Sequence, residues 1–287
     1  DGLESRGLGD VYKRQHSGVR AQNCSVLLNH FLIVVDSTTY QAIEDSEILH
    51  SDFAFAYARN KTWEGIYIIG KDNYIEVFHP NSIRDEHLPI GFTWICHASM
   101  FANCTENYVL PENDLIDYST DEYYDELSVF TRDSSTLFTT REINKKQYES
   151  WTKKEFNDSL VFLTTDYNSP AESDSSKNYL FKNITGIEVV ANSKDSSNII
   201  EYLHLIGYRP DTKATNKVRF SNSKDFVELT FSEDIEIPSI SVIHFELNAP
   251  VEQKRIVAGT SEIILNGIRG KWAVSYTHLR AHETLVH

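Results

Sequence analysis

The chain has 287 residues, of which 42 are acidic and 27 are basic, so its formal net charge at pH 7 is −15. A surface this acidic repels phosphate backbones, which argues against a nucleic-acid-binding protein. No apolar run approaches the roughly 20 residues that a transmembrane segment needs, and three cysteines are too few for a disulfide scaffold.

Both ends of the chain resemble translated sequencing adapter. Residues 6–15 (RGLGDVYKRQ) are similar to one frame of a transposon mosaic-end adapter, and residues 274–284 (VSYTHLRAHET) to its reverse complement. We therefore expect segments 1–15 and 274–287 to be artefacts of assembled metagenomic sequence, and we exclude them from the fold. The natural chain is then expected to continue at both ends, which leaves its compartment open.

The first predicted unit spans residues 28–79 and begins with a strand, 28–35, that is apolar on both faces. Asp36 is suited to cap a helix that continues to about residue 50. Three short antiparallel strands follow, separated by turn residues, and Pro80 ends the last of them. These strands are predicted at 53–59, 63–69 and 74–78.

The middle of the chain gives weaker signals. A strand is predicted at 90–97, whereas residues 105–135 are strongly acidic without a clear period and favour a loop or lid. A helix over 142–158 and a strand over 159–166 precede a polar loop at 168–177.

The second predicted unit, residues 184–231, repeats the order of the first. Its helix begins after Asn192 and ends at Gly207. Beyond Pro238 four short strands, which we expect to form an antiparallel meander, complete the chain. They are predicted at 240–247, 252–257, 262–265 and 270–274.

The repeat predicts an α+β fold: two βαβββ modules with an inserted central segment and a C-terminal antiparallel β meander. A unit that cannot bury its own apolar face needs its twin, and the seam between twins is a natural place for chemistry. The expected divisions of the natural chain are a first module, an acidic insert, and a second module with the meander. They span residues 16–99, 100–182 and 183–273.

Strand alternation places polar side chains on one face of each unit. His30 shares a face with Leu28 and Leu32, opposite the apolar side that packs under the helix. The same parity predicts that Glu76, Glu188 and Glu228 point with His30 into two facing concavities. A divalent cation would relieve the repulsion between such carboxylates, and this donor set suits Mn, Fe or Mg, with Zn also open.

At these residues the chain resembles the vicinal oxygen chelate (glyoxalase/bleomycin-resistance) superfamily, and more narrowly an uncharacterised bacterial glyoxalase-like family. The resemblance rests on the LNHF opening around His30, the strand of Glu76, and a GYR…W pattern at Gly207–Arg209 and Trp272. It implies one divalent metal (Mn, Fe, Zn or Ni) held by His30, Glu76 and Glu228. It also implies a small oxygenated substrate.

One departure from the superfamily pattern leaves two functions open. Gly186 stands where the second metal-binding histidine is expected. A three-ligand open site would serve a lyase, isomerase or dioxygenase, with Glu228 as ligand or general base and Glu188 as a substitute ligand. Alternatively, the same cleft binds an organic ligand without metal, or the fold serves a non-catalytic surface or secreted protein. His244 and Glu246 share a strand face outside the repeat and are expected to be exposed.

Overall fold

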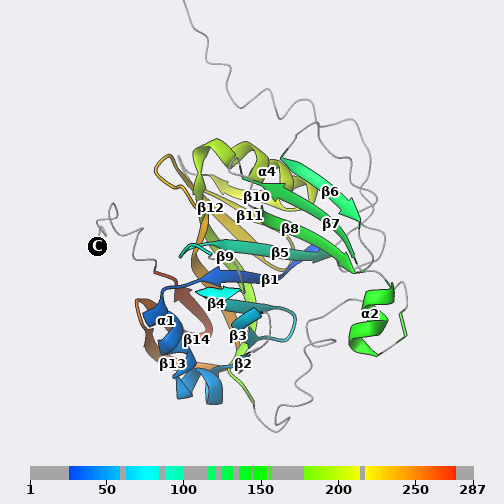
Figure 1. The fold of residues 1–287 in the computed structure, drawn as a ribbon. Helices are drawn as coiled ribbons and strands as arrows, with labels where there is room; N and C mark the ends of the chain where they lie inside the picture. Colours follow the sequence, from blue (N-terminus) through cyan, green and yellow to red (C-terminus); the bar gives the residue numbers. More distant parts are fainter. Residues whose placement is uncertain are drawn as a thin grey trace, which may run out of the picture.

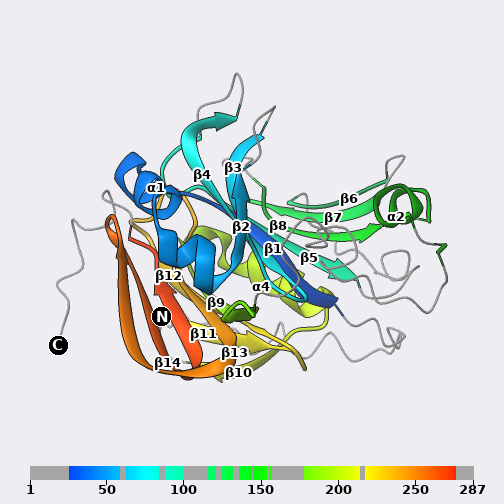
Figure 2. The same cartoon turned by 90° about the horizontal axis from the view of Figure 1, so that it is seen from below.

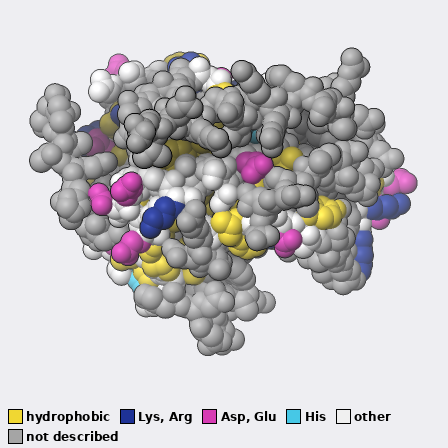
Figure 3. Space-filling view, turned by 90° about the horizontal axis from the view of Figure 1, so that it is seen from above, with side chains coloured by type: hydrophobic (Ala, Val, Ile, Leu, Met, Phe, Trp, Pro, Cys, Tyr) yellow, Lys and Arg dark blue, Asp and Glu magenta, His cyan; other side chains and the backbone are white. Residues whose placement is uncertain are grey.

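The computed structural model describes residues 26–58, 63–83, 88–99, 115–120, 124–131, 136–143, 145–153, 155–156, 178–213 and 217–275. Within them the protein is mostly β-sheet with few helices, in two mixed sheets (Figure 1), which is compatible with the predicted α+β class. None of the described helices is long and apolar enough to cross a bilayer. On the face drawn in Figure 3, the acidic and basic side chains of the described residues lie intermixed.

The larger sheet has eight strands in the order β2-β3-β4-β1-β5-β8-β7-β6. Strand β1 lies parallel to β4 and antiparallel to β5, and β5 lies parallel to β8. A short helix α1 (Ser37–Glu44) and a π-helical turn at Leu49–Phe53 connect β1 to β2. The strands are β1 (Val26–Val34), β2 (Phe55–Ala58), β3 (Trp63–Ile69), β4 (Tyr74–Ile83), β5 (Thr93–Ser99), β6 (Ile116–Thr120), β7 (Tyr124–Phe130) and β8 (Thr136–Ile143).

The smaller sheet has six strands in the order β10-β11-β12-β9-β13-β14, with β9 parallel to β12 and antiparallel to β13. A 3-10 turn (Ser193–Asp195) and helix α4 (Ser196–Leu205) follow β9, and Gly207, at φ +96°, allows the chain to reverse after α4. The strands are β9 (Phe181–Asn192), β10 (Arg209–Lys213), β11 (Lys217–Ser221), β12 (Phe226–Ser232), β13 (Ser239–Ala258) and β14 (Ser261–Ala273).

Three local predictions were wrong. The acidic stretch contains β6 and β7, which extend the larger sheet, so its described residues are not a lid. Pro80 lies within β4, beyond Phe78, the last β4 residue in the register with β1. The expected four-strand meander is one long hairpin of β13 and β14, whose irregular registers reflect bends within two continuous strands. The helix predicted at 142–158 is α2 (Lys145–Thr152), and the strand predicted at 159–166 lies outside the described residues.

The most consequential difference from the expected arrangement is which strand pairs with β1. Residues 184–231 lie in the smaller sheet, whereas β1 pairs with β5. The half-sheet β5-β8-β7-β6 repeats the strand order of β1-β4-β3-β2, and in each half the parallel pair lies at the end where the two halves meet. The eight-stranded sheet is therefore built from β1–β4 together with β5–β8, and none of its strands comes from residues 184–231.

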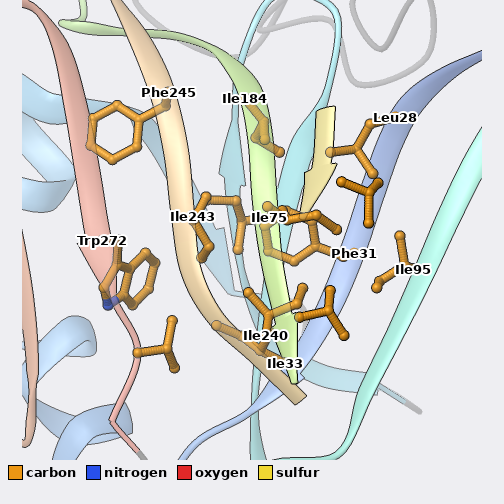
Figure 4. Packing of buried hydrophobic residues seen from close by; sticks show 14 of the residues in the cluster. Leu28, Phe31, Ile33, Ile75, Ile95, Ile184, Ile240, Ile243, Phe245 and Trp272 are labelled. Carbon is orange, nitrogen blue, oxygen red and sulfur yellow. The ribbon is translucent and has the colours of Figure 1, made fainter. Parts of the chain in front are cut away.

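The two sheets share one hydrophobic core. Side chains such as Phe31 and Ile75 of the larger sheet belong to the same buried cluster as Ile187 and Ile243 of the smaller one, and Figure 4 shows β1 and β9 contributing side chains to it. Helix α1 lies beside the β13–β14 hairpin (Figure 2), and α4 contacts β7. The charged residues that alternate with the core residues consequently lie on the two sheet faces turned away from the core.

A β-bulge in β1 places Leu28 and His30 on opposite faces of the sheet. Leu28 pairs with His97 and His30 pairs with Cys96, so Asn29 is an extra residue on β1. The bulge breaks the alternation, because Leu28 lies in the core cluster with Phe31. The prediction that Leu28 and His30 share a face was therefore wrong, although His30 and Leu32 do lie on the same side.

The N-terminus of α1 is tied to the turn of the distant hairpin. Asp36 accepts hydrogen bonds from the backbone N–H groups of Thr38 and Thr39, each at 3.0 Å, as an N-cap should. Its second carboxylate oxygen accepts from the hydroxyl of Thr260 at 3.0 Å, and Thr39 Oγ1 accepts from Thr260 N at 3.1 Å. Gly259, at φ +61°, approaches Thr39 so closely that an added Cβ would lie 2.4 Å from its Cα.

Candidate functional site

His30 lies in an aromatic environment on the outer face of the eight-stranded sheet. Its ring stacks on Tyr74 of β4, with centroids 4.5 Å apart and planes 13° apart, and it meets Trp94 of β5 edge-on at 5.4 Å. Tyr67 of β3 continues the row, 6.4 Å from Tyr74. Such stacking requires these strands to be adjacent, which the β3-β4-β1-β5 order provides.

The protonation of His30 follows from its surroundings. Burial lowers its pKa to about 3, and the positive charge of Arg141 acts in the same direction, so the ring is neutral at pH 7. Nδ1 lies 2.8 Å from Asn29 Oδ1. Because an amide oxygen only accepts, Nδ1 carries the hydrogen, and Nε2 has the lone pair. His30 can therefore accept a hydrogen bond or coordinate through Nε2.

Arg141 of β8 brings a positive charge to the same face. Its guanidinium lies over the Trp94 ring, 4.6 Å from the centroid, and its Nε donates to Glu126 of β7 at 2.5 Å. Cys96, which pairs with His30 across β1 and β5, is buried, and burial raises the pKa of its thiol to about 11. Sequence reasoning missed Arg141, Trp94 and Cys96, because it did not place β5 and β8 beside β1.

Glu76 lies in the same outer layer as His30. It is 8% exposed and pairs with Leu32 of β1 and Tyr67 of β3. His30 and Glu76 thus occupy the same face of neighbouring strands, as the sequence predicted, while Tyr74 is the residue in direct register with His30. The two predicted residues of the first unit lie in one half of the larger sheet.

Glu228 lies in the smaller sheet, in a different environment. Both of its carboxylate oxygens are paired, one with Lys217 Nζ and the other with Arg219 Nε at 2.9 Å. Glu188 beside it accepts from Lys217 Nζ at 3.2 Å and lies 2.8 Å from His244 Nε2. The hydrogen bond from His244 lowers the pKa of Glu188 to about 2, aided by Lys217 and against the effect of burial. These contacts describe an ion-pair network, and His244 is only partly exposed.

Gly186 has a packing reason for its missing side chain. The ring of Phe226, its partner in β12, covers it so closely that a Cβ would lie 2.3 Å from Cε1. The guanidinium of Arg219 lies over this ring, 4.2 Å from its centroid. A histidine at Gly186 would require the space that Phe226 occupies.

The donor set does not fit the predicted metal centre. His30 and Glu76 belong to the larger sheet, whereas Glu228 belongs to the smaller sheet and is saturated by two cations. Among the described residues, no three His, Cys, Asp or Glu side chains lie close enough together to hold a metal ion. The guanidinium of Arg141 near His30 also disfavours a second positive charge there.

The GYR…W pattern has a structural explanation. Tyr208 donates from its hydroxyl to buried Asp225, and Arg209 Nη1 donates to the carbonyls of His204 and Tyr208 at 3.1 and 2.9 Å. Trp272 is a fully buried member of the core. The residues of this pattern therefore stabilise the turn after α4 and the packing between the two sheets.

Comparisons with known proteins give a partial match. Residues 28–100, about a quarter of the chain, match a protein family of unknown function (DUF5829). No curated protein matches. A hypothetical protein from Staphylococcus aureus is 9% identical with a TM-score of 0.42, over 82% of this chain and 97% of that chain.

A second solved structure is a Mn(II)-bound glyoxalase from Novosphingobium aromaticivorans. It is 9% identical with a TM-score of 0.42, over 84% of this chain and 79% of that chain. Neither structural likeness assigns an activity here. The segment that carries β1, β4 and β5, with His30, Glu76 and Trp94, is thus similar to a family whose function is unknown.

Proposed function

We propose that this protein is a glyoxalase-like small-molecule-binding protein whose ligand lies against His30 on the outer face of the eight-stranded sheet, without a bound metal ion. One observation carries the proposal: a neutral imidazole is held between Tyr74 and Trp94, with its acceptor nitrogen defined by Asn29. A buried, desolvated acceptor among aromatic rings is typical of sites for small organic ligands.

The ligand we expect is planar, uncharged and bears a hydroxyl group. Flat rings favour a planar partner, and Nε2 of His30 accepts a hydrogen bond from a donor. The guanidinium of Arg141 is already paired with the carboxylate of Glu126, so an anionic ligand would have to compete with that ion pair. A hydroxylated aromatic compound has the required chemistry.

The proposal includes a division of the chain that follows the sheets. We place one paired glyoxalase-like unit in residues 26–143, because β5 to β8 complete the sheet that β1 to β4 begin. The second unit, residues 181–273, then contributes a βαβββ order of its own together with the β13–β14 hairpin. This division replaces the boundary expected after residue 99.

The second candidate is the metal-dependent lyase, isomerase or dioxygenase expected from the resemblance. The observation in its favour is that His30 and Glu76 are buried on one face of adjacent strands. Among the side chains described beside them, the one further soft metal ligand is the Cys96 thiol, which is protonated at pH 7. This candidate requires a ligand set that the described residues do not supply.

The test measures metal content and ligand affinity on the same preparations. Calorimetric titration with phenols and catechols, and with benzoates of the same shape, is compared for the parent, Trp94→Leu and His30→Ala. We expect phenols to bind more tightly than benzoates, and both substitutions to weaken binding about tenfold or more. Glu228→Gln is the matched control, since its carboxylate lies in the other sheet.

Metal analysis after supplementation with Mn, Fe, Zn and Ni separates the two candidates. Near-stoichiometric metal that is lost in both His30→Ala and Glu76→Ala would refute the metal-free site and support the enzyme. A parent that binds none of the planar compounds, with its fold intact, would also contradict the proposal.

A further inference from the structure

The peptide group that begins the β1 bulge is held from the other sheet. Leu28 N donates to Asp225 Oδ2 at 2.9 Å, across 197 positions of sequence. Asp225 lies just before β12 and is 7% exposed, and its other oxygen accepts from the hydroxyl of Tyr208. A buried carboxylate that accepts from a backbone N–H contributes a strong, charge-assisted hydrogen bond.

Two asparagines hold the same stretch of β1. Asn222 Nδ2 donates to the carbonyl of Val26 at 3.0 Å, while Asn222 Oδ1 accepts from Asp225 N at 2.8 Å and so fixes the carboxylate. Asn73, in the turn before β4, donates to the carbonyl of Leu28 at 3.4 Å and bonds both backbone groups of Ile184. Side chains from both sheets therefore hold the strand on the N-terminal side of Asn29.

The bulge lets Leu28 and His30 lie on opposite faces of the sheet. In a regular strand these two residues would share a face, whereas the extra residue Asn29 lets Leu28 enter the core while His30, like Leu32, lies on the outer face. The side chain of Asn29 in turn accepts from His30 Nδ1. Asn29 thus connects the two features: it follows the peptide group of Leu28 in the chain, and its side chain selects the tautomer of His30.

We propose that Asp225 is a positioning residue for His30: by holding Leu28 N from the second sheet, it maintains the bulge that places Asn29 against the imidazole and so sets its tautomer. The effect on ligand affinity rests on the proposed function, whereas the effect on the imidazole does not. The second sheet thereby supports the binding face of the first one.

The test uses ¹⁵N-histidine NMR of the full chain, with the His30 signals identified by their loss in His30→Gln. The parent should show one protonated and one unprotonated ring nitrogen, in the pattern of an Nδ1–H tautomer. In Asp225→Asn the amide cannot accept from both Leu28 N and Tyr208, so we expect these two signals to shift toward an averaged pattern. Affinity for the best phenol should fall about tenfold.

Asp36→Asn is the matched control, because it likewise replaces a buried carboxylate by a neutral amide, but at the opposite end of β1. It should lower stability and leave the His30 signals in place. Tyr208→Phe is the milder variant, with a smaller shift in the same direction, and it decides the question if Asp225→Asn does not fold.

Folded variants of Asp225 or Tyr208 with unchanged His30 signals would overturn the inference. A shift of these signals in a protein that binds no planar compound would refute the proposed function and retain the positioning role.

Discussion

Adding one methyl group at Gly186 should destabilise the protein through a single neighbour. The Cβ of Gly186→Ala would lie 2.3 Å from Phe226 Cε1, whereas ordinary contact begins at 3.4 Å, so the ring must move by about 1 Å (3.4 − 2.3 Å). Overpacking of this kind costs about 1–3 kcal/mol, against which alanine gains about 0.5–1 kcal/mol over glycine in a strand. We expect a net loss of about 1 kcal/mol in the free energy of unfolding.

Chemical denaturation in two backgrounds tests this reasoning. With Phe226→Ala the obstructing ring is gone, so Gly186→Ala should become stabilising by about 0.5–1 kcal/mol. Gly207→Ala is a contrasting control, since nothing lies within 4 Å of its added Cβ and its cost comes only from φ +96°. An equal effect of Gly186→Ala in both backgrounds would refute the packing explanation.

Three further predictions concern charge and capping. His30 and His97 have pKa values lowered to about 3, mainly by burial, so their contribution to stability is present above pH 6.5 and is lost as the pH falls toward 3. The urea midpoint should therefore drop between pH 7 and pH 5, and His30→Gln should make that drop smaller; an unchanged slope would contradict the assignment of a neutral His30. Asp36→Ala should cost about 1 kcal/mol through loss of the α1 N-cap, measured by the same denaturation, and a change of less than a few tenths would argue against the cap. Glu228→Gln should cost about 1 kcal/mol, because its cationic partner Lys217 is well exposed to water. This loss should be smaller in a Lys217→Met background, where only the pair with Arg219 remains to be lost, and an equal loss in both backgrounds would argue against a contribution from the Lys217 pair.

The elements of highest apolar content were the ones that sequence reasoning could locate. Strands β1 and β9 and the helix after β9 are dense in branched apolar residues, and Gly207 marks the end of that helix as expected. The strands β6 and β7 were missed because their acidic side chains obscure the alternation of Leu127 and Val129, which are buried. Local patterns of charge do not reveal which face a distant strand will cover.

The candidate site was only half accessible to sequence reasoning, for a topological reason. His30 and Glu76 share one repeat unit, so period-two alternation was enough to place them on one face. Arg141 reaches this face because β5 and β8 follow β1 in the sheet, and that pairing has no counterpart in local sequence. The bulge at Asn29 is equally hidden, since its hydrogen-bond partner Asp225 lies 197 positions away from Leu28.

The contact of Gly259 and Thr260 with the start of α1 has a practical consequence for labelling and for fusion proteins. Hairpin turns are ordinarily where an epitope tag or a fluorescent protein can be inserted with least harm. Here the turn between β13 and β14 fits against Thr39 with no room for a side chain, and it shares hydrogen bonds with Asp36. An insertion there would separate α1 from the second sheet. The exposed turn at Lys71, after β3, is a poor site as well, because the N–H of Lys71 donates to the carbonyl of Lys182 at 2.7 Å. Lys224, before β12, is exposed and its N–H is satisfied by Asn222, so a label attached to its side chain leaves both of these contacts in place. An insertion at Lys224 would instead displace Asn222 and Asp225 from β1.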